Sequence, residues 1–441
     1  MLPQAGLLIT QFADAAVAYF FSDAELIRYM LRAEVALAQA EAQLSVIPLQ
    51  AAEAIAQAAT TLQPDWDRLR TEAERDGVPV TEFVRQLRAH INSDAKHYVH
   101  WGATTQDILD TALVLQLRDA LNEIEPNLQS LISNLSTLAN TYRHTLMAGR
   151  THSQQALPIT FGFKVANWLA PLLRHRERLA QLKPRLLVVQ LGGAVGTLAA
   201  LGDKGPQVQK AFAQELDLGV PTLPWHTQRD CLAELANWLS LVTGSLAKMA
   251  QDIILLAQSE VGELSENADP TRGGSSTMPQ KSNPIVSERI VAAARTNASL
   301  LGNMHQSLIQ EHERATHGWQ MEWLTLPQMI SLTAGALKSA DFLAANLVVN
   351  KERMVANVNA SNGLMLAERL SLALTPALGR EQAKRVLREA CEIALRETKN
   401  VVDVLQGRVD ANLYWDALRD ERNYLGATQE FIDQVLVVAA G

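Results

Sequence analysis

The segment that organises this chain is Gly273-Gly274-Ser275-Ser276-Thr277-Met278-Pro279-Gln280-Lys281-Ser282-Asn283-Pro284. It is small, polar and rich in glycine, and it lies between two of the longest apolar-periodic runs of the sequence, Cys231–Leu264 and Ile285–Glu311. Connections between packed helices usually take ~2–8 residues and seldom carry so many hydroxyl, amide and cationic groups. We therefore interpret the segment as a mobile loop that carries chemistry on a rigid helical scaffold.

The composition predicts a helical protein without a general affinity for polyanions. Of the 441 residues 48% are hydrophobic, only 5% are aromatic, and alanine and leucine are abundant, which favours helix. A net charge of -8 without any block of Lys or Arg argues against nucleic acid or an anionic membrane as a general partner. Any anionic ligand must therefore find a local positive pocket.

The two cysteines and the N-terminus point to the cytoplasm. Cys231 and Cys391 lie inside helical patterns, where buried thiols are more usual than a disulfide. No Lys or Arg precedes Arg28, so the basic start of a signal peptide is missing. The longest uncharged run, residues 186–202, contains four glycines and is too short and too broken to span a bilayer.

Apolar periodicity predicts an all-α fold dominated by five long helices. We place these helices at about residues 106–145, 156–181, 230–264, 285–312 and 326–350. In the third of them apolar residues occupy most of the circumference, so it must be buried on several sides, as in a bundle shared between subunits. A bend is expected at Pro126.

Shorter helices flank this central part and predict three domains. Near the start, Ser22 is the expected N-cap of a helix over residues 23–42, a second helix follows Pro48, and a third begins at Thr81. From Asn362 onward the helices shorten again. The predicted domains are an N-terminal helical domain (1–105), a central long-helix domain with the glycine-rich loop (106–355) and a C-terminal helical domain (356–441).

Further polar clusters stand at the ends of the long helices. The first, residues 97–107, has Gly102 for a tight turn and Thr104 or Thr105 as the cap of the next helix. It is either a plain capping turn beside a structural His100 or a carboxylate site at a helix N-terminus. The second cluster, residues 149–158, is a polar link that brings Arg150 and His152 together. The remaining clusters cover residues 224–230 and 310–319.

The glycine-rich run within residues 186–202 does not indicate a dinucleotide site. Its spacing is not GxGxxG, strands do not alternate with helices, and no acidic residue follows at the expected distance. A short extended excursion with tight turns is the expected structure. Carboxylate and His residues do not cluster at ligand spacing either, so no metal site is predicted.

Taken together, these motifs resemble the fumarase/aspartase superfamily. GGSSTMPQKSNP is similar to the superfamily signature GSSxMPxKxNP, and HWGATTQD and GRTHSQQALPIT resemble its first and second blocks in the expected order. The resemblance covers essentially the whole chain. It implies three helical domains, a twenty-helix core in a homotetramer and active sites assembled from three subunits.

Within the superfamily, several stretches resemble the 3-carboxy-cis,cis-muconate cycloisomerases. These stretches are RLLVVQLGGAVGTLAALGDKG, PWHTQRD and QEHERATHGWQMEWLTLP. The alternative is an adenylosuccinate-lyase-like enzyme that releases fumarate. Such lyases normally carry Arg-Tyr-Ser near the N-terminus, whereas Ile9-Thr10-Gln11-Phe12 stands here, and a polar segment where this chain has Trp319, Met321 and Trp323. Apolar bulk there suits a small tricarboxylate substrate.

The resemblance implies catalysis without metal, nucleotide or redox cofactor. The superfamily's proton carrier at carbon corresponds to Ser275, whose hydroxyl needs stabilisation as an alkoxide. Lys281 and the helix N-terminus near Ile285 are the expected source of that stabilisation. The groups expected to bind the substrate, chiefly its carboxylates, are Lys281, Asn283, Arg314, Thr104, Thr105, Gln155, Arg150 and His100.

In the lyases a His–Glu dyad protonates the leaving group, and the resemblance maps it onto His152 and Glu288. A carboxylate leaving group has a pKa near ~4 and needs no proton at neutral pH. We therefore expect His152 to orient the substrate and to be less important than Ser275. A catalytically idle helical tetramer is a third hypothesis, disfavoured because the whole predicted catalytic set is present.

Overall fold

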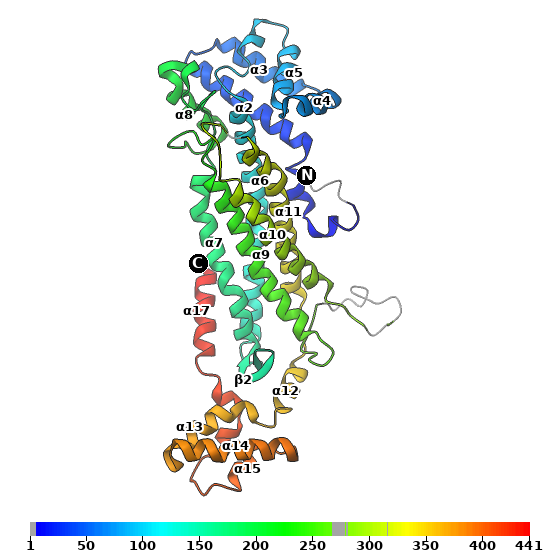
Figure 1. Cartoon of the computed structure of the whole chain (residues 1–441), viewed down its shortest axis with the longest axis vertical. Helices are drawn as coiled ribbons and strands as arrows, with labels where there is room; N and C mark the ends of the chain where they lie inside the picture. Colours follow the sequence, from blue (N-terminus) through cyan, green and yellow to red (C-terminus); the bar gives the residue numbers. More distant parts are fainter. Residues whose placement is uncertain (1–5, 267–277, 279–280, 315) are drawn as a thin grey trace. The chain divides into compact units, whose positions relative to one another are not determined.

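The computed structural model describes residues 6–266, 278, 281–314 and 316–441 (Figure 1). Nearly all regular structure in these residues is helical, which confirms the predicted all-α fold class. The chain divides into two compact units, each made of three segments. Unit 1 comprises Met1–Asn127, His175–Gly244 and Ala292–Lys338, and unit 2 comprises Leu128–Arg174, Ser245–Val291 and Ser339–Gly441. The division into three domains stays a prediction.

The five long helices exist, with different ends. They are α6 (Thr105–Thr141), α7 (Phe161–Leu186), α9 (Asp230–Leu256), α10 (Ile285–Gln306) and α11 (His317–Asn346), and each contributes residues to both units. Four of them, α6, α9, α10 and α11, end four to eight residues before the predicted position, and α7 ends five residues after it. α11 begins nine residues earlier than predicted, since the polar start His317-Gly318 hides its first turn.

Unit 1 contains the short helices of the N-terminal part. They are α1 (Ala15–Tyr19), α2 (Asp23–Gln43), α3 (Leu49–Thr61), α4 (Trp66–Asp76) and α5 (Val80–His90), joined later in the chain by α8 (Gly205–Leu216). Ser22 caps α2 through a bond from N of Glu25, as predicted. The prediction missed α4, and the next helix begins at Val80. α2, α3 and α8 pack around one apolar core that includes Tyr29, Phe83 and Phe212.

Unit 2 contains a β-hairpin that the sequence did not predict. Strands β1 (Leu146–Thr151) and β2 (Gln154–Thr160) pair antiparallel, so residues 156–160 are extended and not helical. A second pair joins β3 (Leu264–Ser265) to β4 (Val348–Val349). The closing helices are α12 (Lys351–Asn359), α13 (Ala367–Leu378), α14 (Arg380–Glu397), α15 (Val401–Gln406), α16 (Trp415–Arg419) and α17 (Thr428–Ala440).

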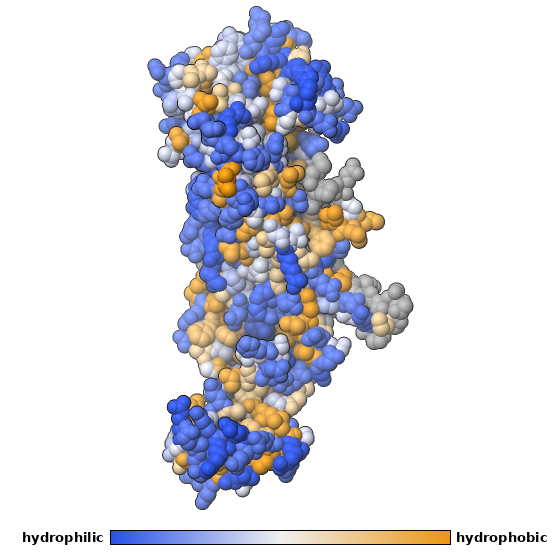
Figure 2. All heavy atoms as spheres, viewed as in Figure 1, coloured by the Kyte–Doolittle hydropathy of each residue, from blue (hydrophilic) through white to orange (hydrophobic). Residues whose placement is uncertain are grey.

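α9 is the most apolar of the long helices. It is the one helix among the described residues whose length and composition would suffice to cross a membrane, a test that a core helix also passes. Asp252 in its last third accepts a bond from Nε1 of Trp168 (2.7 Å) and pairs with Lys248, which is the behaviour of a helix packed in protein. Patches of hydrophobic residues lie between polar ones on the face drawn in Figure 2, and exposed apolar side chains on the long helices include Leu241, Leu255, Ile285 and Leu324.

Both cysteines are free thiols, as expected, although each is only half-buried.

Candidate active site

Arg314 and two threonines form a cluster in unit 1. One guanidinium nitrogen of Arg314 donates to Oγ1 of Thr104, and the other donates to Oγ1 of Thr105 (2.9 Å). The threonines lie at the N-terminus of α6, which is a site of positive potential. A guanidinium, two hydroxyl groups and a helix N-terminus together suit a carboxylate. The structure therefore brings together three of the predicted carboxylate ligands, although their role in binding stays a prediction.

Asp107, in the first turn of α6, binds the same helix end through its side chain. Its carboxylate is fully buried and accepts from the main-chain N of Thr104 (3.0 Å), Gly192 (2.9 Å) and Gly193 (3.0 Å), and from Nε2 of His226 (2.7 Å). Asp107 was not among the residues predicted for the site. A signal was present, because an acidic residue three positions after a threonine N-cap is the pattern of a capping box.

His100 is held by a glutamate from a distant helix. Its Nδ1 lies 2.6 Å from Oε1 of Glu34 on α2, and its backbone is left-handed (φ 61°), a conformation that non-glycine residues keep only when their surroundings enforce it. Burial lowers the pKa of His100, but the charge and the hydrogen bond of Glu34 outweigh that effect and raise it. His100 is therefore a candidate cation in unit 1.

Glu41 lies two helical turns beyond Glu34 on α2. It is fully buried, and neither carboxyl oxygen has a hydrogen-bond partner among the residues that the structure describes. Burial, together with the charge of Glu34, raises the pKa of Glu41 to about 9, so this carboxyl is neutral at physiological pH. The signal in the sequence is the spacing of seven residues that places the two glutamates in one apolar stripe.

A buried ion network joins α6 and α11 to the residue that precedes α9. The guanidinium of Arg229, fully buried, pairs with Asp110 on one side and Glu322 on the other. Nε1 of Trp319 donates to the carboxylate of Asp110 (3.0 Å). Cζ of Arg229 lies 4.7 Å from the ring centroid of Trp225, in a cation–π contact. Burial raises the pKa of Glu322, and Arg229 opposes that rise. The network ties together the ends of three helices that carry polar clusters.

The second polar cluster forms a tight hairpin in unit 2. His152 and Ser153 are the two loop residues between β1 and β2, and both have positive φ (49° and 63°), as a two-residue hairpin turn requires. His152 is exposed at the tip. Gln155, on β2, donates to the main-chain O of Asn357 (3.3 Å).

Arg150 is engaged in an ion pair. Its guanidinium donates twice to the fully buried carboxylate of Glu263, at 2.7 and 2.9 Å. Nδ2 of Asn357 donates to the same carboxylate (2.8 Å). We predicted Arg150 as a cation for the substrate, but in this chain Glu263 compensates its charge and the pair joins β1 to the segment before the glycine-rich loop.

Glu266 caps the N-terminus of α10. Its two carboxylate oxygens accept from N of Val286 (3.0 Å) and N of Ser287 (2.6 Å), and its side chain is buried. We expected this helix N-terminus to stabilise an alkoxide at Ser275, and the structure shows that two of its amides already bind a carboxylate. These two amides are therefore occupied, and the stabilisation of a Ser275 alkoxide by this helix end stays a prediction.

The remaining predicted residues lie in unit 2. Lys281 and Asn283 lie at the end of the glycine-rich loop, and Glu288 lies in the first turn of α10; Lys281 and Glu288 are exposed and Asn283 is half-buried. No hydrogen bond joins His152 to Glu288 among the residues that the structure describes, so their pairing stays a prediction. Ser275 lies outside the described residues.

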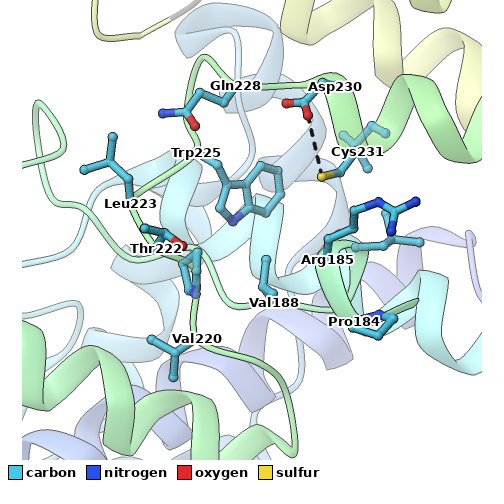
Figure 3. A pocket seen from close by; sticks show the side chains of 13 residues that line it. Pro184, Arg185, Val188, Val220, Thr222, Leu223, Trp225, Gln228, Asp230 and Cys231 are labelled. Carbon is cyan, nitrogen blue, oxygen red and sulfur yellow. Dashed lines mark hydrogen bonds between the residues drawn. The ribbon is translucent and has the colours of Figure 1, made fainter. Parts of the chain in front are cut away.

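Unit 1 also has a cavity of about 440 Å³ next to the start of α9 (Figure 3). Figure 3 shows the ring of Trp225 in the middle of the lining side chains, and Sγ of Cys231 donates a hydrogen bond to the carboxylate of Asp230. Apolar residues such as Val188 and Leu223 line the rest. None of the predicted site residues lines this cavity. Within the described part of the chain no group of His, Cys, Asp and Glu residues could hold a metal ion.

Comparison with known proteins gives the family. Residues 9–296 match the family model described as lyase, and residues 363–435 match the model described as adenylosuccinate lyase C-terminus. This chain belongs to the fumarase/aspartase superfamily. It is an enzyme of that superfamily.

Relatives within the fumarase/aspartase superfamily carry more than one activity. The 3-carboxy-cis,cis-muconate cycloisomerase of Acinetobacter baylyi is 43% identical over 99% of both chains. Trans-aconitate decarboxylase 1 of Mycosarcoma maydis is 40% identical over 98% of this chain and 89% of its own. The crystal structure of 3-carboxy-cis,cis-muconate lactonizing enzyme from Pseudomonas putida is 40% identical, with a TM-score of 0.93 over 98% of this chain and 99% of that one.

Proposed function

We propose that this enzyme is a 3-carboxy-cis,cis-muconate cycloisomerase, which forms 4-carboxymuconolactone in the protocatechuate branch of the β-ketoadipate pathway. The observation that carries the proposal is the Arg314–Thr104–Thr105 cluster in a chain that is 43% identical, over nearly its full length, to such a cycloisomerase. The cluster offers a cation and two hydroxyl groups to one carboxylate of a small polyanion.

The reaction is an isomerisation that needs no co-reactant. One substrate carboxylate adds to a carbon–carbon double bond conjugated with another carboxylate, so a carbon–oxygen bond forms and the electron pair moves onto the second carboxylate as an aci-carboxylate. Protonation of the adjacent carbon completes the lactone. Cations that stabilise the aci-carboxylate lower the barrier, because negative charge accumulates there in the transition state.

Most of the predicted residues have a role in this scheme. Ser275 protonates carbon, Lys281 and Asn283 hold the carboxylate that becomes the aci-carboxylate, and Arg314 with its threonines holds another. His100, kept cationic by Glu34, balances the third negative charge. His152 and Glu288 orient the substrate. In this chain Arg150 has a bound counter-ion, so we assign it to the scaffold of the hairpin.

The proposal includes a homotetramer whose active sites draw residues from three subunits. Exposed apolar side chains on three long helices support it, because a partner chain would remove them from water: Leu241, Leu255, Ile285 and Leu324. Sedimentation or light scattering of the purified protein measures this directly, and a monomer at micromolar concentration would contradict it.

Three substrates separate the candidate activities. The alternative is an adenylosuccinate-lyase-like enzyme, favoured by the match of residues 363–435 to that family's C-terminal region. The purified protein is incubated with 3-carboxy-cis,cis-muconate, adenylosuccinate or trans-aconitate. Loss of diene absorbance in the ultraviolet with the muconate only supports the proposal. Release of fumarate from adenylosuccinate, or decarboxylation of trans-aconitate, with an unchanged muconate spectrum would overturn it.

A further inference from the structure

Asp107 is a buried carboxylate on which four N–H groups converge. Oδ1 accepts from Gly192 and His226, and Oδ2 accepts from Gly193 and Thr104, at 2.7–3.0 Å. An ionised carboxylate offers about four acceptor positions, so this side chain is saturated. Its four donors come from three separate stretches of sequence, which Asp107 holds in one arrangement.

Gly192 and Gly193, whose amides bind Asp107, lie so close to their neighbours that a side chain would not fit at either position. A Cβ on Gly192 would lie 2.8 Å from Cε1 of His226 and from Cβ of Pro224, and Gly193 has φ +68° with its Cβ position 3.1 Å from O of Gly102. Only glycines can therefore present two consecutive amides to one carboxylate at this point. This accounts for the glycine-rich run that resembles a dinucleotide loop without being one.

The bonds of Asp107 leave the hydroxyl of Thr104 available. In a usual capping box the N-cap hydroxyl accepts from the N–H three residues later. Here N of Asp107 donates to the main-chain O of Thr104 (3.0 Å), while the Asp107 carboxylate accepts from N of Thr104. Oγ1 of Thr104 instead accepts from Arg314. A hydroxyl that accepts from a guanidinium still has its own hydrogen to donate.

We propose that Asp107 is a positioning residue of the carboxylate-binding site: it fixes the helix end so that the Thr104 hydroxyl bonds Arg314 and can donate to a substrate carboxylate. The inference deepens the proposed function and rests on it, because it concerns the same site. Asp107 does not touch the substrate and acts only through Thr104. Asparagine at this position has one acceptor oxygen, and its amide hydrogens would face N–H groups, so two of the four donors would lose their acceptor.

The test is a double-mutant cycle in catalysis with Asp107→Asn, Thr104→Val and both together. We expect each single variant to raise KM about tenfold with kcat changed less than about threefold, and the double variant to be little worse than either. Thr111→Val is the control, because Thr111 lies on the same helix as Asp107 and is also buried. Its hydroxyl makes two hydrogen bonds with the main chain of Gln190 (both 3.0 Å) and does not touch Thr104. It should lower the unfolding temperature and leave KM unchanged.

Additive effects of Asp107→Asn and Thr104→Val, or a KM for Asp107→Asn equal to that of the wild type, would overturn the inference. If Asp107→Asn does not fold, His226→Phe replaces it, because this variant removes one of the four donors to Asp107. It should also raise KM, and an unchanged KM would overturn the inference. The cycle is run with whichever of the three substrates the wild type consumes, so a wrong substrate contradicts only the proposed function. For a wild type that consumes none, the dissociation constant of 3-carboxy-cis,cis-muconate replaces KM, with the same two outcomes.

Discussion

The carboxylate of Glu34 lies 2.6 Å from Nδ1 of His100, and this buried contact sets the charge of a predicted substrate ligand. Because Glu34 raises the pKa of His100 against the effect of burial, Glu34→Gln should lower that pKa. The pH titration of the His100 Cε1 proton by NMR measures it. We expect the alkaline limb of kcat/KM to move to lower pH in the variant, because the imidazolium is lost sooner.

The same pair predicts how stability depends on pH. A raised pKa in the folded state stabilises the fold fully below the unfolded value of about 6.5, and the stabilisation is lost as pH rises through the folded pKa. The unfolding free energies of wild type and Glu34→Gln should therefore differ most below about pH 6. Glu25→Gln, which removes the partner of Arg28 on the same helix, is the control and should leave the His100 titration in place. An identical titration of His100 in Glu34→Gln would refute the assignment.

Because the carboxyl of Glu41 is buried, we predict that Glu41→Gln is more stable than the wild type. Its pKa of about 9 lies above that of an unfolded glutamate, so the unfolded chain releases a proton that the folded chain retains as pH rises. Stability is therefore full in acid and falls progressively from about pH 4.5 to about pH 9. Glu41→Gln keeps the shape without the acid and should be more stable by on the order of 3 kcal/mol near neutral pH. Urea unfolding at about pH 5 and about pH 8 measures it; a gain that does not grow with pH would contradict the reasoning.

The pair of Arg150 and Glu263 predicts a loss of stability. Arg150→Met leaves the buried Glu263 carboxylate with Asn357 as its remaining side-chain partner, and breaking such a pair costs about 3 kcal/mol. Arg396→Met is the matched control, because Arg396 pairs with Glu397 at the surface and should cost less than about 1 kcal/mol. Urea unfolding of both variants compares them. If Arg150 binds substrate directly, Arg150→Met will instead raise KM strongly with an unchanged unfolding midpoint.

Local patterns in the sequence predicted the helices well, because each signal lies within the element itself. Ser22 before an apolar stripe specifies the start of α2, and Pro284 precedes the start of α10. The hairpin was missed because its turn is formed by His152 and Ser153 with positive φ, where Asn or Gly is the usual signal. The antiparallel pairing of β1 with β2, not the propensity of these two residues, requires that conformation.

Partners of the site residues could not be predicted, since they lie far away in the sequence. Glu34 and His100 are 66 residues apart in the sequence, and Glu263 and Arg150 are 113 residues apart. Apolar periodicity carries no information about contacts over such separations. The motif blocks identified Thr104, Thr105 and Arg314, but that Arg314 donates to both threonine hydroxyls follows only from the structure. Sequence motifs thus give the chemical groups, while the long-range contacts determine which of them are charged and which are already neutralised.

Ser275 and His152 provide a direct test of the chemistry. In the proposed reaction carbon must be protonated, whereas the carboxylate that adds requires no proton transfer at neutral pH because its pKa is near ~4. Ser275→Ala should therefore lower kcat by about a thousandfold or more, and His152→Asn by about tenfold with a larger effect on KM. His152 is exposed at a hairpin tip, so its replacement should leave the unfolding midpoint unchanged and the comparison is one of chemistry. Steady-state kinetics in deuterium oxide adds a second readout, since slower protonation in Ser275→Ala should raise the solvent isotope effect. Equal, large losses of kcat in the two variants would show that an acid–base dyad is needed after all, as in a lyase whose leaving group must be protonated.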